Sequence, residues 1–240
     1  MTSASVSNSQ YLNRFSRIFL FSCVINNFKK RSNYYKNRSI YKWPQHFVIK
    51  MKPEDKIYKA YFESKKISLY FNEIKELSKL SDSSLTNTLT KLVKNSSLIR
   101  EKTKSNTFYK IKDKKLFALK FSEIALQEFN NLNIGVKVPL RNFLKDIPKE
   151  IYTIVLFGSA SRKEERRGSD IDILIIAEKK TNLTKNKKEA EITSKHPISI
   201  FQANINQFIE NKDDIIIQAR KTGFPIYKEQ NFYGAILDEY

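Results

Sequence analysis

The chain has 240 residues, enough for one large domain or two small domains with cores of their own. Its 44 lysines and arginines exceed its 25 acidic residues, and the net charge of +19 favours a polyanionic partner such as nucleic acid, a nucleotide or an anionic membrane. One cysteine excludes an internal disulfide framework, two histidines offer no apparent zinc site, and no apolar run approaches the roughly 18 to 20 residues of a membrane span. We therefore expect a cytoplasmic protein with no membrane partner.

Residues 1–50 differ in charge from the rest of the chain. They contain nine basic residues and no acidic one, and Glu54 is the first acid. Neither helical nor alternating periodicity is evident in them. Three interpretations stay open: a disordered basic arm, an acid-poor targeting peptide, or translated sequence upstream of a true start at Met51. The first and third are favoured, because "MKPEDKIYKAYF" leads directly from charged residues into an amphipathic helix.

Three amphipathic helices are predicted between residues 53 and 94. Apolar residues recur at helical spacing in each of them. The apolar positions are Ile57, Ala60 and Tyr61 in the first helix, Phe71, Ile74, Leu77 and Leu80 in the second, and Leu85, Leu89, Leu92 and Val93 in the third. Asp82 and Ser83 can both cap the third helix, so we place it at residues 83–94.

The opposite face of the third helix carries short polar and cationic side chains of the kinds that contact phosphates and base edges. They are Ser83, Ser84, Asn87, Lys91 and Lys94. The stretch "SLIREKTKSNTFYKIK" then predicts two short strands about a polar turn. The order of these elements resembles a winged helix-turn-helix domain over roughly residues 54–115: two helices, a turn, a third helix and a basic hairpin.

This resemblance implies that helix 83–94 enters the major groove of double-stranded DNA and that Arg100, Lys102 and Lys104 lie on the wing near the backbone. The alternative is a small helical domain that only packs against its neighbour or mediates dimerisation. DNA binding is favoured because the polar face is cationic and not of mixed sign.

A further amphipathic helix is predicted at residues 114–132, and Gly135 and Pro139 then interrupt the pattern. We place a domain boundary near residue 135. The predicted division is a leader at 1–50, a winged helix-turn-helix domain with a linker helix at 51–134, and a second domain at 135–240.

The second domain contains an unusual strand. A predicted strand at 152–157 ends in Gly158 and Ser159, where the backbone can approach a ligand and following amides can bind phosphate oxygens. After a charged loop, "DIDILIIA" predicts a buried strand. Alternation along it puts Asp170 and Asp172 on one face, roughly 7 Å apart at Cα, where they can hold Mg²⁺ beside a triphosphate.

The whole stretch "VLFGSASRKEERRGSDIDILII" resembles the minimal nucleotidyltransferases of the DNA polymerase beta superfamily, through Gly-Ser, ten residues and Asp-x-Asp. The resemblance implies an α+β protein whose second domain has a mixed sheet. It also implies that Gly158 and Ser159 hold the nucleotide phosphates, that Asp170 and Asp172 are the catalytic metal ligands, and that Arg162 lies at the mouth of the site.

The chain departs from that family's pattern at two places. Lys163 stands where family members commonly have glycine. The family's third carboxylate is missing from the next predicted strand, "PISIFQANI", which offers Ser199 and Gln202 in its place, and Glu189 and Glu191 lie just upstream in a predicted helix. Loss of the third acid is expected to slow or abolish transfer while sparing nucleotide binding.

The last part of the chain predicts a helix with Ile215, Ile216 and Ile217 inward. Gly223 and Pro225 end this helix, and a short strand follows. We expect this region to serve packing.

Taken together, these features predict a Mg²⁺-dependent nucleotidyltransferase with a DNA-binding domain. Its expected reaction transfers a nucleoside monophosphate, foremost AMP from ATP or another NTP, to a hydroxyl of a protein, RNA or small molecule. The alternative is a DNA-binding regulator, or an antitoxin-like protein with a small toxin-like partner, whose degenerate transferase domain only binds nucleotide or forms a homodimer.

Overall fold

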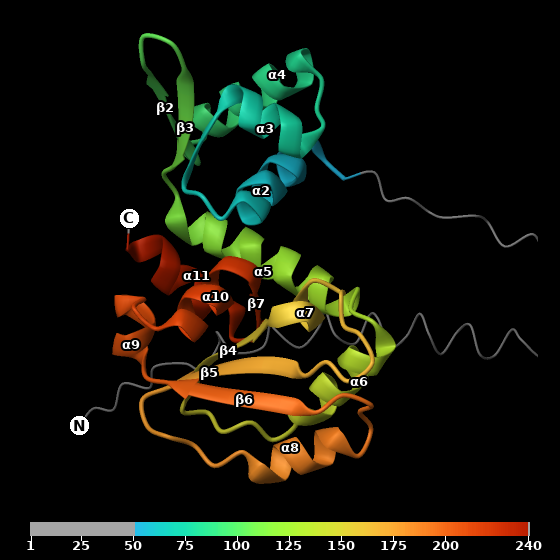
Figure 1. Ribbon diagram of the computed structural model, residues 1–240. Helices are drawn as coiled ribbons and strands as arrows, with labels where there is room; N and C mark the ends of the chain where they lie inside the picture. Colours follow the sequence, from blue (N-terminus) through green and yellow to red (C-terminus); the bar gives the residue numbers. More distant parts are fainter. Residues whose placement is uncertain (1–50, 240) are drawn as a thin grey trace, which may run out of the picture. The chain divides into compact units, whose positions relative to one another are not determined.

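The computed structural model describes residues 51–239, which form one compact unit (Figure 1). The three interpretations of residues 1–50 fall outside the described residues. Within the described part, no helix combines the length and apolar character that a membrane crossing requires.

The first half contains four helices and a small antiparallel sheet in the order β1-β3-β2. The helices are α2 (Pro53–Ser64), α3 (Phe71–Ser78), α4 (Asp82–Lys94) and α5 (Lys114–Asn130). The strands are β1 (Ser68–Tyr70), β2 (Leu98–Lys102) and β3 (Thr107–Ile111). The three predicted helices and the hairpin are therefore present, and the short strand β1, which has no sequence signal of its own, pairs with β3.

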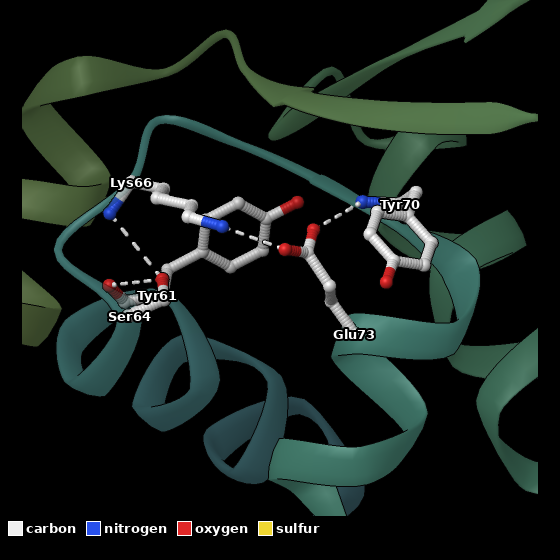
Figure 2. A network of polar contacts seen from close by, with 5 residues as sticks. All are labelled: Tyr61, Ser64, Lys66, Tyr70 and Glu73. Atoms are coloured by element: carbon white, nitrogen blue, oxygen red, sulfur yellow. Dashed lines mark hydrogen bonds and ion pairs between the residues drawn. The ribbon is translucent and has the colours of Figure 1, made fainter.

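A polar network stabilises the turn between α2 and α3 (Figure 2). The Glu73 carboxylate accepts the backbone N–H of Tyr70 at 3.1 Å, which satisfies a free donor at the start of α3. Its other oxygen pairs with Lys66 Nζ at 2.6 Å. The buried hydroxyl of Tyr61 donates to the carbonyl oxygen of Tyr109 at 2.6 Å, and this bond ties α2 to the sheet.

The second half is built on a four-stranded mixed sheet in the order β6-β5-β4-β7. The strands are β4 (Ile151–Phe157), β5 (Ile171–Ala177), β6 (Ile198–Ala203) and β7 (Phe224–Tyr227). The strand β5 is antiparallel to β4 and parallel to β6, whereas β7 is antiparallel to β4. The mixed sheet predicted for this half is therefore present.

Helices cover both faces of this sheet, with α6 and α8 on one side and α10 and α11 on the other (Figure 1). The helices of this half are α6 (Ile134–Phe143), α7 (Gly158–Ser161), α8 (Thr184–Glu191), α9 (Ile205–Glu210), α10 (Asp214–Thr222) and α11 (Glu229–Asp238). The passage from α10 to β7 is tight, since a Cβ at Gly223 would lie 2.6 Å from the carbonyl oxygen of Leu156.

The helix α5 joins the two halves. It packs against both α2 and α11. The ring of Phe117 on α5 meets the rings of Tyr58 and Tyr61 edge-to-face, with centroids 5.0 and 5.4 Å away. Further along α5, Phe121 contacts Tyr233 of α11 at 5.4 Å. An aromatic core therefore runs from the first half into the second.

Two expectations from the sequence differ from the structure. Gly135 and Pro139 were expected to interrupt the helical pattern, but both lie within α6, and the helix continues although proline has no N–H to donate. Of the three consecutive isoleucines expected to point inward, Ile216 is buried whereas Ile217 is exposed, because one face of α10 cannot bury three successive residues. The predicted domain boundary near residue 135, which implies that the segments on either side fold independently, stays a prediction.

Substitution of Phe117 is expected to destabilise the whole described unit. The side chain is fully buried among aromatic rings, and Phe117→Ala should cost about 3–5 kcal/mol through lost burial and a cavity. Leu126→Ala on the same helix is the control, because Leu126 is 53% exposed. Chemical denaturation of both variants measures the difference; equal, small losses would contradict the assigned core.

Candidate functional site

The pairing of β4 with β5 brings the glycine turn to the aspartates. Phe157 is the register partner of Asp172, so Gly158 follows directly beside it. Gly158 has a φ of +73°, and a Cβ at this position would overlap Oδ2 of Asp172. Glycine is required here both for its backbone conformation and for the close approach of the carboxylate. The strand pairing therefore places the glycine turn directly against the Asp172 carboxylate.

A serine that the sequence analysis did not single out holds the glycine turn in place. Ser161 Oγ is buried and lies within hydrogen-bonding distance of two backbone carbonyl oxygens, Gly158 at 2.8 Å and Thr222 at 3.2 Å. The second contact joins the turn to the end of α10. The only sequence signal for this role is a small hydroxyl residue three positions after the glycine, which is too common to be specific.

Asp170 and Asp172 form the charged part of the site. Desolvation by burial, with a further contribution from the Asp170 charge, raises the pKa of Asp172. Among the described residues, neither aspartate forms an ion pair with lysine or arginine. The two carboxylates are therefore like charges on one face with no protein cation to offset them.

Ser199 lies where the sequence analysis looked for a third acid. The strand β6 pairs in parallel with β5, and Ser199 is the register partner of Asp172. Its hydroxyl donates a hydrogen bond of 2.7 Å to Oδ2 of Asp170. The chain therefore places a neutral hydrogen-bond donor beside the carboxylates, and this donor orients Asp170.

The two upstream glutamates do not replace the missing acid. Glu191 accepts the backbone N–H of Ile198 and pairs with Lys187, whereas Glu189 pairs with Lys185 on the same helix. Between residues 51 and 239, no cluster of three or more histidine, cysteine or acidic side chains is present. The donor set is thus two carboxylates. Such a pair fits Mg²⁺, which proteins commonly hold through one or two carboxylates together with substrate phosphates.

The charged loop after α7 contains the other predicted residues. Arg162 pairs with Glu164 at 2.7 Å and does not contact the aspartates. Lys163, which stands where glycine was expected, has a φ of +60°, a conformation that favours glycine. Its ammonium group pairs with Glu128 of α5 at 3.0 Å. The backbone thus keeps the glycine-like shape, and the lysine side chain links the loop to α5.

Comparison with known proteins agrees with this geometry. Residues 139–222 match the nucleotidyltransferase domain family. The match spans β4, the glycine turn, both aspartates and β6, and it covers less than half of the chain. No curated protein and no solved structure matches the chain. The family match confirms that the predicted nucleotidyltransferase resemblance is correct for this part of the chain.

The residues predicted to contact DNA lie on α4 and on the β2–β3 hairpin. Most of them are exposed, and they comprise Ser83, Asn87, Lys91, Lys94, Arg100, Lys102 and Lys104; Ser84 is half-buried. Lys91 forms an ion pair with Glu54 of α2 at 2.5 Å, which offsets part of its charge. The basic residues of the hairpin form no ion pair within the described part of the chain.

Asp172→Asn is expected to stabilise the metal-free protein at pH 7.5. The folded-state pKa of Asp172 lies above its unfolded value, so ionised Asp172 reduces the free energy of unfolding above the folded pKa. At about pH 2.5, well below the ordinary carboxyl pKa, the group is protonated in both states and the gain should vanish. Thermal melting of the parent and of Asp172→Asn in EDTA at both pH values measures this difference in stability.

Glu178→Gln, at an exposed carboxylate just beyond the other end of β5, is the matched control and should change little at either pH. An equal gain for Asp172→Asn at about pH 2.5 and at about pH 7.5 would contradict the account in which desolvation and the Asp170 charge disfavour ionised Asp172.

Proposed function

We propose that the nucleotidyltransferase domain binds Mg²⁺ and a nucleoside triphosphate and transfers the nucleoside monophosphate, foremost AMP from ATP, to a hydroxyl of a protein, RNA or small molecule. The observation that carries the proposal is the close packing of Gly158 against Asp172, with Asp170 on the same face and with neither carboxylate ion-paired to a lysine or arginine of residues 51–239. The family match at residues 139–222 supports the same class of reaction.

In this mechanism, backbone amides of the turn at Gly158 and Ser159 bind phosphate oxygens, and Ser161 fixes the turn. Asp170 and Asp172 would hold Mg²⁺, which supplies positive charge that neutralises the phosphates as charge develops. The acceptor hydroxyl oxygen bonds to the α-phosphorus and its proton passes to solvent, while the bond from the α-phosphorus to the bridging oxygen breaks and pyrophosphate leaves. Ser199 holds Asp170 in a fixed orientation through its hydrogen bond.

The proposed site is tested by calorimetry with ATP, with and without Mg²⁺. Asp170→Asn with Asp172→Asn should abolish the Mg²⁺-dependent part of ATP affinity, because the oxygen donors lose their charge while their shape is nearly kept. Ser199→Asp should increase Mg²⁺-dependent affinity, because it places a third carboxylate at the register position of Asp172.

Gln202→Asp, three residues further along β6, is the matched control for Ser199→Asp, because Gln202 pairs with Ile175 and not with the aspartates. If ATP binds equally to the parent and to the double aspartate variant with and without Mg²⁺, the aspartates hold no nucleotide-linked metal. Incubation with α-labelled ATP, Mg²⁺ and cell extract then tests transfer itself, and label on an acceptor is the expected result.

One observation favours a second candidate function. Ser199 is neutral and its hydroxyl is bonded to Asp170, so the site lacks a third acid that would help to activate the acceptor hydroxyl. The second candidate is a DNA-binding regulator, or an antitoxin-like protein with a toxin-like partner, in which the domain binds nucleotide or forms a homodimer. Nucleotide binding without any labelled acceptor would favour this candidate.

We also propose that the first half is a winged helix-turn-helix domain that binds double-stranded DNA, with α4 in the major groove and the β2–β3 hairpin as the wing. The order of helices and strands and the exposed basic residues support this assignment. It is independent of the transferase site, which lies on β4, β5 and β6.

Arg100→Ala is expected to weaken DNA binding and to reduce its dependence on salt. Each neutralised phosphate releases counterions, so the loss of one contact should lower the slope of log affinity against log salt by about 1. Lys91→Ala should have a smaller effect, because Glu54 already pairs with Lys91. Anisotropy of labelled duplex DNA between about 50 and 200 mM salt measures both effects.

Lys188→Ala, at an exposed lysine on α8, is the control and should bind DNA like the parent. Parent-like binding by Arg100→Ala, or binding that is no stronger at low salt, would indicate that the first half has a structural role instead.

A further inference from the structure

A cavity of about 260 Å³ lies between α2 and the helices α10 and α11, apart from the aspartates and the glycine turn. Five aromatic side chains line it: Tyr61, Phe62, Phe121, Phe232 and Tyr233. Tyr233 is at the centre of this group, with its ring edge-on to Phe121 at 5.4 Å and to Phe232 at 5.1 Å. Such walls favour a planar aromatic ligand, which can make both stacked and edge contacts.

The other polar residues lining the cavity are mostly cationic. Lys65, Lys66, Arg220 and Lys221 line it, and no acidic residue does. Glu73 pairs with Lys66 and Glu239 pairs with Arg220, whereas Lys65 and Lys221 have no ion pair within residues 51–239. Two positive charges at the cavity are therefore not offset by an acidic side chain.

Lys65 is the cation best placed to receive an anion. Its ammonium group lies 4.4 Å from the ring centroid of Phe62 and donates to the carbonyl oxygen of Gly223 at 3.3 Å. Lys65 is exposed at the surface, yet desolvation by the surrounding protein lowers the pKa of Lys65 to about 8, so its side chain is mostly charged at pH 7. A carboxylate is a stronger acceptor for this ammonium group than the carbonyl it now contacts.

Two lining residues also carry buried polar atoms that lack a hydrogen-bond partner in the described part of the chain. They are Tyr233 Oη and Asn211 Oδ1. Tyr233 is 4% exposed. A buried polar atom without a partner reduces stability, and a water, an ion or a ligand in the cavity can supply the missing bond.

We propose that this cavity is a binding site for a small planar aromatic carboxylate, with its ring among the aromatic side chains and its carboxylate at Lys65 and Lys221. The volume is slightly below the range of about 300–1,000 Å³ that is usual for drug-sized ligands, which limits the ring system to one or two fused rings. No residue of the proposed transferase site lines this cavity, so the two sites are distinct. The ligand would contact α2 and α5 of the first half and α10 and α11 of the second.

The test is calorimetry of the full chain at pH 7 with 1-naphthoate, and with 1-naphthalenemethanol as the uncharged counterpart. Saturable binding of one naphthoate per chain is expected. Ile217 lines the cavity and is 39% exposed, so Ile217→Trp should fill the cavity without disturbing the core and weaken binding at least roughly tenfold. Ile192→Trp, at an 83% exposed isoleucine at the end of α8, is the matched control and should keep the parent affinity.

Lys65→Met tests the carboxylate contact. It keeps an unbranched apolar chain but removes the ammonium group, so naphthoate should bind roughly tenfold more weakly while 1-naphthalenemethanol is unaffected. Absence of saturable naphthoate binding to the parent would overturn the proposal. So would equal affinity of the parent and Ile217→Trp, or an unchanged naphthoate affinity in Lys65→Met. Thermal melting confirms that each variant is folded.

Discussion

The second half of this protein depends on the approach of Gly158 to Asp172. Antiparallel pairing of β4 with β5 places the end of one strand beside the carboxylate of the other, and only a residue without a Cβ fits between them. The same glycine takes a positive φ, so the chain can leave β4 and begin α7 at once. The turn that can bind phosphate and the carboxylate that can bind metal are thus positioned by a single steric constraint.

Two hydroxyl groups support this arrangement from either side. Ser161 connects the turn to the end of α10, and Ser199 connects Asp170 to β6. Both are neutral, so they set geometry without reducing the repulsion between the aspartates. The raised pKa of Asp172 is a consequence first of burial and then of the unrelieved repulsion from Asp170. A bound cation would relieve the repulsion between the two aspartates. A pair of carboxylates therefore still suits a metal ion that is bound together with a nucleotide.

Aromatic side chains of α5 pack against both halves of the described chain and so join their cores. Phe117 faces the first half and Phe121 reaches Tyr233 in the second, so one helix contributes to both cores. Lys163 adds an ion pair between the loop of the transferase site and Glu128 of the same helix. The cavity beside Tyr233 lies at this junction, where a ligand would contact helices from both halves.

The sequence alone located the three helices and the hairpin of the first half and the two strands beside the aspartates. Alternation along "DIDILIIA" put Asp170 and Asp172 on one face, and helical spacing located the three helices of the first half, because these patterns are local and burial enforces them. The resemblance of "GSASRKEERRGSDID" also identified the nucleotidyltransferase class, which the family match supports. The same resemblance marked Lys163 as a departure expected to change the loop shape, but the backbone there keeps a positive φ.

Only the tertiary structure decided how distant segments meet. The sequence could identify Ser199 as a residue on the strand where the family's third carboxylate is expected. The hydrogen bond from Ser199 to Asp170, however, depends on the parallel register of β5 and β6. Likewise, the Ser161 contact with Thr222, the pairing of Lys91 with Glu54 and the cavity beside Tyr233 join residues on different elements. Periodicity describes which face of an element is buried, but the partner of that face is set by packing across the whole fold.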